Sequence, residues 1–168
     1  MLIMVKWLRK SKSAMVILTI IRIWLGYLWA MDGFGKISGG FSAKGFVGMA
    51  IKNPVMTPEK TQAFGWYTDF LRDLVMPHIS LFSTLVAWGE LLVGLGLIFG
   101  TLTTAAAFFG MMMNFFYLMA GTVSVNPMYI FWEIFILVAG FNAGKIGLDR
   151  WVIPFLREKL PFLKKLVE

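Results

Sequence analysis

One carboxylate stands at the centre of an apolar run, and its chemistry is the first question that the sequence raises. Glu90 lies within residues 85–100, where every other side chain is apolar or absent. An ionisable side chain at mid-membrane depth costs about 2.5–3.5 kcal/mol on insertion scales, so such a residue is expected to face the protein interior and to have a partner there. Glu90 is therefore predicted to mark a binding site or a buried ion pair.

Arg22 is the predicted partner of Glu90. Counted from the ends of their apolar runs at a rise of 1.5 Å per residue, both side chains lie about 12–15 Å from the same membrane surface. In one interpretation the pair only fixes the register of two helices, with Gly89 and Gly94 allowing close packing. In the other, it lines a polar cavity that binds a headgroup, a quinone carbonyl or a proton, because charges inside membranes are usually functional.

Two further polar pairs are predicted. Glu133 and Asn114 share a layer about 10 Å deep when each is counted from the nearest turn, and they form a ligand site or simple interhelical glue. Asp32 and Lys36 are spaced i,i+4 with the acid first, which is the favourable order for a pair on one helix face. This second pair lies near the end of its apolar run, so a solvated pair at the rim is expected.

Two tryptophans could stack against a ring-shaped ligand inside the bundle. Trp29 and Trp88 lie in the same apolar runs as the buried charges, although aromatic packing or anchoring at the membrane surface explains them equally well.

The sequence has no cysteine, one histidine, no glycine-rich phosphate loop and no metal-ligand spacing. It therefore predicts no metal site, no thiolate nucleophile and no covalently bound cofactor.

The elements that position these residues are membrane helices. Hydrophobic residues make up 58% of the chain and the mean hydropathy is +0.74, more apolar material than a soluble core of 168 residues can bury. The sequence predicts one all-α domain over residues 1–168, a bundle of four transmembrane helices. The predicted spans are residues 14–37, 78–100, 104–121 and 127–145.

Two amphipathic segments complete the prediction. Residues 38–77 form an interfacial segment on the outer face, and residues 146–168 form a basic tail. Lys and Arg gather before the first span and after the fourth, while the two short turns have none, so both termini are predicted to be cytoplasmic. The net charge of +7 then reflects topology and anionic lipid, not nucleic acid.

Several short motifs occur in the same order as in a known family. They are residues 22–26 (RIWLG) with 33–36 (GFGK), 88–94 (WGELLVG), 114–127 and 147–151 (GLDRW). Over about residues 15–155 the chain resembles the DoxX family of integral membrane proteins. The resemblance implies a four-helix membrane bundle, with recurrent polar positions at Arg22, Lys36, Glu90, Asn114 and Asp149.

The resemblance also directs the functional expectation. Two relatives, the DoxD and DoxA subunits of thiosulfate:quinone oxidoreductase, pass electrons from thiosulfate to quinone, and other members are linked to thiol and oxidative-stress systems. The leading expectation is a DoxX-like protein of the bacterial inner membrane that acts as a quinone-binding or redox-associated subunit, and whether it belongs to a quinone-linked oxidoreductase stays open. Arg22 would donate to a quinone oxygen, Glu90 would carry the proton, and a protein partner at the outer loop would supply electrons.

Two alternatives stay open at this point. The first is a non-enzymatic assembly or chaperone-like subunit that binds the transmembrane helix of a partner, or a second copy of this chain, with purely structural polar pairs. The second is a carrier of small solutes or lipids, which is least favoured because no internal repeat typical of many transporters is found.

Overall fold

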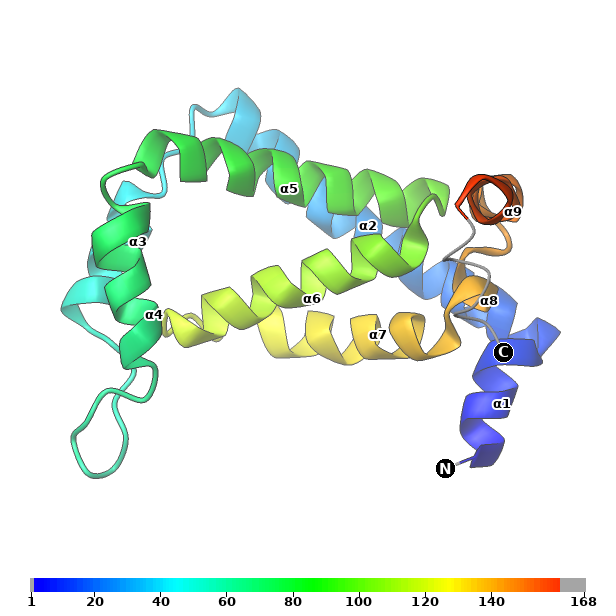
Figure 1. Ribbon diagram of the computed structural model, residues 1–168, viewed down its shortest axis with the longest axis horizontal. Helices are drawn as coiled ribbons and strands as arrows, with labels where there is room; N and C mark the ends of the chain where they lie inside the picture. The colour runs from blue at the N-terminus through cyan, green and yellow to red at the C-terminus, as the bar shows by residue number, and fades with distance from the viewer. Residues whose placement is uncertain (1, 161–168) are drawn as a thin grey trace.

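Four apolar helices form the body of the protein, and they run roughly along its long axis (Figure 1). The structure is a computed structural model that describes residues 2–160. Within that range, α2 (Lys12–Ser38) and α5 (Ile79–Phe99) are long and apolar enough to cross a membrane. Two shorter apolar helices, α6 (Thr103–Met119) and α7 (Asn126–Ala139), lie beside them.

The closest packing in the bundle joins α2 to α5. A Cβ built on Gly26 would lie 2.8 Å from the carbonyl oxygen of Gly94, and one built on Gly94 would overlap the backbone of Ala30. Gly33 meets the backbone of Leu91 in the same way. Small residues at such contacts let two membrane helices approach closely, which replaces the hydrophobic driving force that lipid does not supply.

The bundle encloses an apolar core and turns a second apolar surface outward. Large aliphatic and aromatic side chains on all four long helices are exposed; they include Ile20, Ile23, Tyr27, Leu85, Trp88, Leu92, Phe108, Phe109, Phe115, Phe131 and Ile134. An apolar belt of this extent is unfavourable in water and suited to lipid. The chain is therefore a helical protein of the membrane.

The predicted spans agree with the helices except in the fourth. Residues 14–37, 78–100 and 104–121 correspond to α2, α5 and α6 within two residues at each end. The predicted span 127–145 is broken instead: α7 ends at Ala139, Gly140 adopts a φ of +57°, and a short helix α8 (Phe141–Gly144) follows. A positive φ combined with a ψ of −130° is readily adopted only by glycine, and the helix ends at this position.

A cap covers one end of the bundle. It consists of α3 (Lys44–Lys52), α4 (Gly65–Phe70) and the π-helical turn η1 (Leu71–Val75), which stand across the bundle axis in Figure 1. The ring of Tyr67 stacks on Phe116 of α6 at 5.7 Å between centroids, which fastens the cap to the bundle. Burial also raises the pKa of Tyr67 to about 12, so its phenol stays neutral. The predicted amphipathic segment 38–77 is thus an ordered part of the fold.

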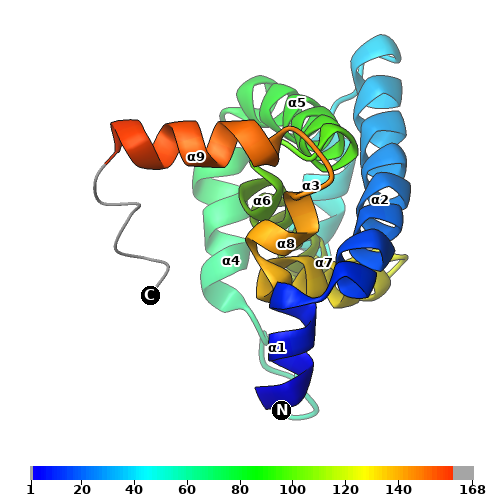
Figure 2. The same ribbon diagram turned by 90° about the vertical axis from the view of Figure 1, so that its right-hand side faces the viewer.

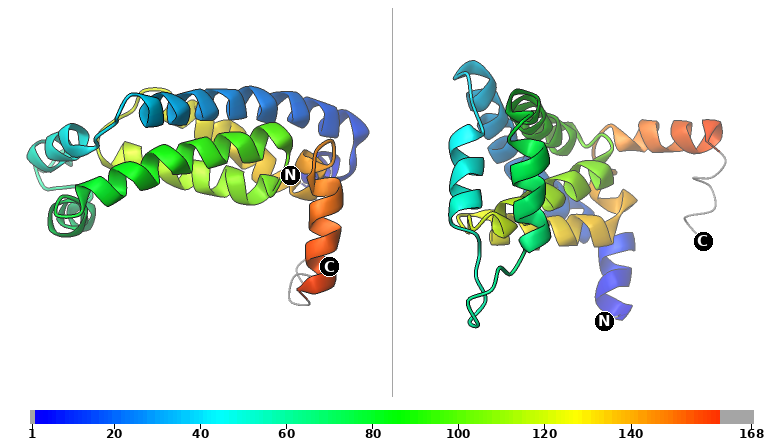
Figure 3. Two further views of the ribbon diagram at one scale, coloured as in Figure 1. Left: turned by 90° about the horizontal axis from the view of Figure 1, so that it is seen from above. Right: turned by 60° about the vertical axis from the view of Figure 1, so that its left-hand side comes forward.

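Two other helices lie at the opposite end of the bundle, with both ends of the described chain (Figure 2). α1 (Leu2–Lys10) lies before the predicted first span and was not predicted as a helix. It is tied to α8 because Asn142 Nδ2 donates to the carbonyl of Leu8 at 2.7 Å. α9 (Asp149–Lys159) corresponds to the predicted tail and extends away from the bundle (Figure 3). The last part of that predicted tail, residues 161–168, lies outside the described residues.

Candidate ligand-binding site

Lys36, Glu90 and Tyr117 form a hydrogen-bonded cluster where α2, α5 and α6 meet below the cap. Lys36 Nζ donates to Glu90 Oε2 at 2.5 Å, and the hydroxyl of Tyr117 donates to Glu90 Oε1 at 2.7 Å. The side chain of Glu90 is 3% exposed and that of Lys36 is 26% exposed. One oxygen of the buried carboxylate therefore faces a cation that reaches water, and the other faces a neutral donor.

The predicted pairing of Arg22 with Glu90 is wrong. The contacts between α2 and α5 set the guanidinium of Arg22 against Gly100, just beyond the C-terminal end of α5. That position is about three helical turns away from Glu90 along α5.

The predicted pair of Asp32 with Lys36 is also wrong. Lys36 pairs with Glu90 across the helix interface, while Asp32, on α2, stays exposed.

Arg22 joins several backbone segments at the other end of the bundle. Its guanidinium donates to the carbonyls of Ala143 at 3.0 Å and Ile98 at 2.9 Å, and also to those of Leu97 and Ile146. These oxygens belong to the last turn of α5 and to the segment around α8. A planar group with five N–H donors can satisfy such a set. Arg22 thus has a structural role here, away from the cluster at Glu90.

Asp149 completes the structure around this arginine. Its carboxylate accepts from the backbone N–H of Leu102 at 2.6 Å and of Thr103 at 2.9 Å. Those groups begin α6, where unpaired N–H donors need a partner and a negative charge is favourable. The resemblance singled out Asp149 as a polar position, and the geometry gives this residue a capping role.

Glu133, Asn114 and Trp29 form a second buried cluster deeper in the bundle. Asn114 Nδ2 donates to Glu133 Oε2 at 2.9 Å, and Trp29 Nε1 donates to Glu133 Oε1 at 3.1 Å. The predicted contact between Glu133 and Asn114 is confirmed. All three side chains are at most 2% exposed. Within residues 2–160 the recorded partners of this carboxylate are neutral donors, so it differs from Glu90, which has a cation.

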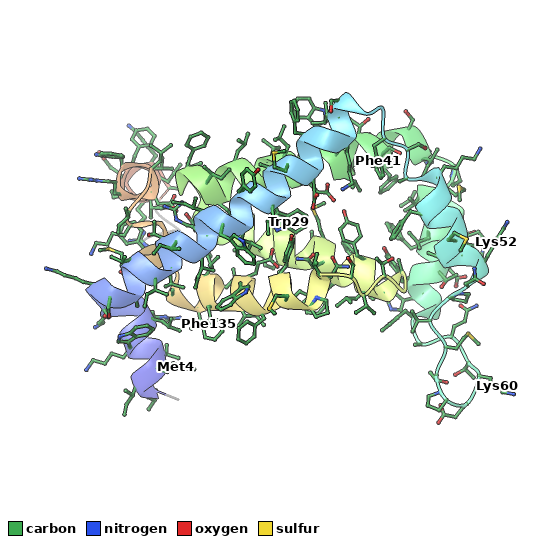
Figure 4. All side chains as sticks on the ribbon, turned by 180° about the vertical axis from the view of Figure 1, so that it is seen from behind. Met4, Trp29, Phe41, Lys52, Lys60 and Phe135 are labelled. Carbon is green, nitrogen blue, oxygen red and sulfur yellow. The ribbon has the colours of Figure 1, made fainter. Side chains whose placement is uncertain are left out.

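A cavity of about 320 Å³ lies between the cap and these clusters. Lys36, Glu90, Asn114 and Tyr117 form part of its wall, and Trp29 lies on the same side. An apolar part of the wall comes from the cap, from α5 and from the loop after α2; it includes Phe41, Phe46, Val47, Leu71, Val75 and Phe82. Polar side chains also form part of the wall; they are Asp32 of α2, Thr122 and Ser124 of the turn between α6 and α7, and Asn126 and Tyr129 of α7. In Figure 4, Trp29 lies near the middle of α2 and Phe41 just beyond its C-terminal end. A largely apolar cavity with few convergent polar groups is typical of a small-molecule site.

Not every predicted site residue lines this cavity. Trp88 is 50% exposed on the outward side of α5, which fits anchoring in lipid and not ligand stacking. Tyr117 was missed by the sequence analysis, although its position offered a signal: it follows Asn114 by three residues, so both lie on one helix face. Within the described part of the chain, no three His, Asp or Glu side chains converge to hold a metal ion.

Comparison of the sequence with models of known protein families identifies the family of this domain. A family model of DoxX matches residues 17–123, more than half of the chain. The chain belongs to the DoxX family. The DoxX match includes Trp29, Lys36, Glu90, Asn114 and Tyr117, and therefore most of the polar wall of the cavity. It ends before α7. No curated protein and no solved structure matches the chain.

Proposed function

We propose that this DoxX protein holds a quinone in the cavity under its cap, as a redox-associated subunit in the membrane. The observation that carries the proposal is the composition of the cavity wall: among the described residues Lys36 is its one cation, it lies beside Glu90 and Tyr117, and aromatic and aliphatic side chains form much of the remaining surface. A quinone ring is flat and apolar and carries carbonyl oxygens at its edge. Such a ring suits a cavity in which apolar and aromatic surface lies beside a few polar groups.

Each polar residue then has a defined task. Lys36 has N–H donors beyond the one that Glu90 accepts, and it binds a carbonyl oxygen. Glu90 holds Lys36 in place and, from the wall of the same cavity, can take up a proton and pass it to the ring as the quinone is reduced. Trp29 and Asn114 close the deep side of the cavity. The assignment replaces Arg22 with Lys36 in the role of the quinone-binding cation.

The proposal includes a protein partner that supplies electrons. The sequence has no cysteine to ligate an iron–sulfur cluster or form a redox disulfide, so the reducing equivalents come from another subunit. The cap is the surface nearest to the cavity and is the proposed docking side. Quinone accepts two electrons and two protons when it is reduced, and the residues described here supply its binding, orientation and contact with a proton donor.

The proposed topology has four spans with both termini in the cytoplasm of a bacterial cell. α6 and α7 are short, but the exposed apolar side chains on both support a place within the membrane. Lys and Arg are dense on α1 and α9, which lie at the end opposite the cap; they include Lys6, Arg9, Lys10, Arg150, Arg157 and Lys159. Cytoplasmic segments carry this excess.

The test is the quinone content of protein purified in mild detergent. Wild type should retain quinone, detected by mass spectrometry, and should bind added menadione, a naphthoquinone without a tail. The double variant Lys36→Met/Glu90→Gln, which removes both charges and leaves neither unpaired, should lose both properties. Lys52→Met, at an exposed lysine of α3, is the matched control and should behave as wild type.

Two results would overturn the proposal. One is folded wild-type protein that neither retains a quinone nor binds menadione. The other is binding that the double variant leaves unchanged. In either case the assembly role, in which the outward apolar surface of the bundle meets the helix of a partner, would be the function to test next.

A further inference from the structure

A second hollow adjoins the cavity on the outer side of α2. This outer groove is lined by Met31, Asp32, Gly35, Lys36, Gly39 and Phe41, and its volume is about 390 Å³. Three of these residues, Asp32, Lys36 and Phe41, also line the inner cavity. The two hollows are therefore neighbours that meet at Asp32, Lys36 and Phe41.

The ion pair shapes the place where they meet. The amine of Lys36 is drawn inward to Glu90, which leaves the methylene stem of the lysine between the two hollows. The ammonium also lies 5.5 Å from the centre of the Phe41 ring, so the two side chains are held together. A ligand with one end beside the amine would extend past this stem and this ring into the outer groove.

The outer groove has room for an extended hydrocarbon group. Two of its six lining residues are glycines, and a Cβ built on Gly35 would have no heavy atom within 4 Å. Met31 and Phe41 supply apolar surface, and Met31 is 51% exposed on the outward side of the bundle. Asp32 is the one carboxylate of the groove, and it lies exposed. The groove thus leads from the polar cluster toward the lipid-facing surface.

We propose that the outer groove binds the isoprenoid tail of the quinone and is the route by which the headgroup enters from the outer half of the bilayer. This inference rests on the proposed function, since it takes the headgroup to be in the inner cavity. It assigns Gly35, Gly39 and Met31 to recognition of the tail, and Lys36 with Phe41 to the junction between head and tail.

The experiment compares two ligands on three proteins in detergent. The ligands are menadione and the same naphthoquinone carrying two isoprene units, each titrated by quenching of tryptophan fluorescence. The proteins are wild type, Gly35→Phe, and the matched control Gly45→Phe, at an exposed glycine of α3 that likewise has open space around its Cβ. Neither site is crowded, so both variants should fold.

A side chain that fills the groove should weaken binding of the tailed quinone and leave binding of menadione unchanged. In Gly35→Phe the dissociation constant for the tailed quinone should rise about tenfold while that for menadione stays within about twofold of wild type. Gly45→Phe should change neither. Unchanged binding of both ligands in Gly35→Phe, or an equal loss of both, would overturn the groove assignment while wild-type binding of menadione still upheld the proposed function. Wild type that binds neither ligand would overturn both proposals.

A second measurement needs no variant. A naphthoquinone with a photoreactive diazirine at the end of its tail should label wild-type peptides that contain residues 31–41. Labelling confined to α6, α7 or the cap would contradict the assignment.

Discussion

The amine of Lys36 and the carboxylate of Glu90 lie 2.5 Å apart, although 54 residues separate them in the chain. The contact joins the C-terminal part of α2 to the middle of α5 below the cap. Its two members differ in access to water, since the side chain of Lys36 is 26% exposed and that of Glu90 only 3%. This asymmetry determines what each substitution should do.

Lys36→Met should destabilise the protein more than Glu90→Gln. Removing one partner of a buried ion pair costs about 3–5 kcal/mol because it leaves the other charge uncompensated. Lys36→Met leaves the buried Glu90 carboxylate with only Tyr117, whereas after Glu90→Gln the lysine can turn toward water. Thermal unfolding in detergent would measure both, and the double variant should be more stable than Lys36→Met alone. Equal losses in the two single variants would contradict this account.

Gly33→Ala should weaken the packing of α2 on α5. Its new methyl group would overlap the backbone of Leu91, and overpacking of this kind costs about 1–3 kcal/mol. Gly35→Ala, two residues along the same helix, has open space and is the matched control. Unfolding midpoints of the two variants should differ clearly, with Gly35→Ala close to wild type. A comparable loss in both would contradict this account, because only Gly33 lacks room for the methyl group.

Arg22→Lys should destabilise the fold without affecting the ligand. A lysine can donate to some of the carbonyls around α5 and α8 but cannot reproduce the planar fork of the guanidinium. Leaving a buried acceptor without its donor costs about 1–3 kcal/mol. The unfolding midpoint should therefore fall, while the folded fraction binds menadione as wild type does. A weakened affinity with an unchanged midpoint would return Arg22 to the binding site.

Single cysteines should report the topology, because the natural chain has none. Ser42→Cys lies beside the cap and Ser13→Cys near the start of α2, and both serines are exposed. In intact cells whose outer membrane is permeabilised, an impermeant maleimide should label the cysteine at 42 and not the one at 13. Labelling at 13 but not at 42 would reverse the proposed orientation.

The sequence predicted some contacts and missed others for a physical reason. Glu133 and Asn114 were matched correctly because only a short turn connects α6 to α7, so depths counted from that turn are comparable. Arg22 and Glu90 were matched wrongly because the whole cap separates α2 from α5. The ends of these helices are not level, and the small residues between them set the register.

The ligand cavity could not be predicted from the helix pattern alone. Its apolar wall depends on how α3 and η1 lie across the bundle, and their residues are brought there by packing such as that of Tyr67 on Phe116. The polar residues Lys36, Glu90 and Asn114 were all singled out in advance, but the cluster that they form with Tyr117 was not. The break at Gly140 was missed because glycine within an apolar run is compatible with an uninterrupted span.

The contacts of Arg22 also bear on how the protein is made. Its carbonyl partners lie at residues 97, 98, 143 and 146, so they are synthesised long after the arginine itself. While the first helix enters the bilayer alone, its guanidinium has none of these acceptors, and the charge then opposes insertion by up to about 2.5–3.5 kcal/mol, the cost at mid-depth. The acceptors of this guanidinium are thus complete only after the last apolar helix has been made, so the junction at Arg22 forms late in the synthesis of the chain.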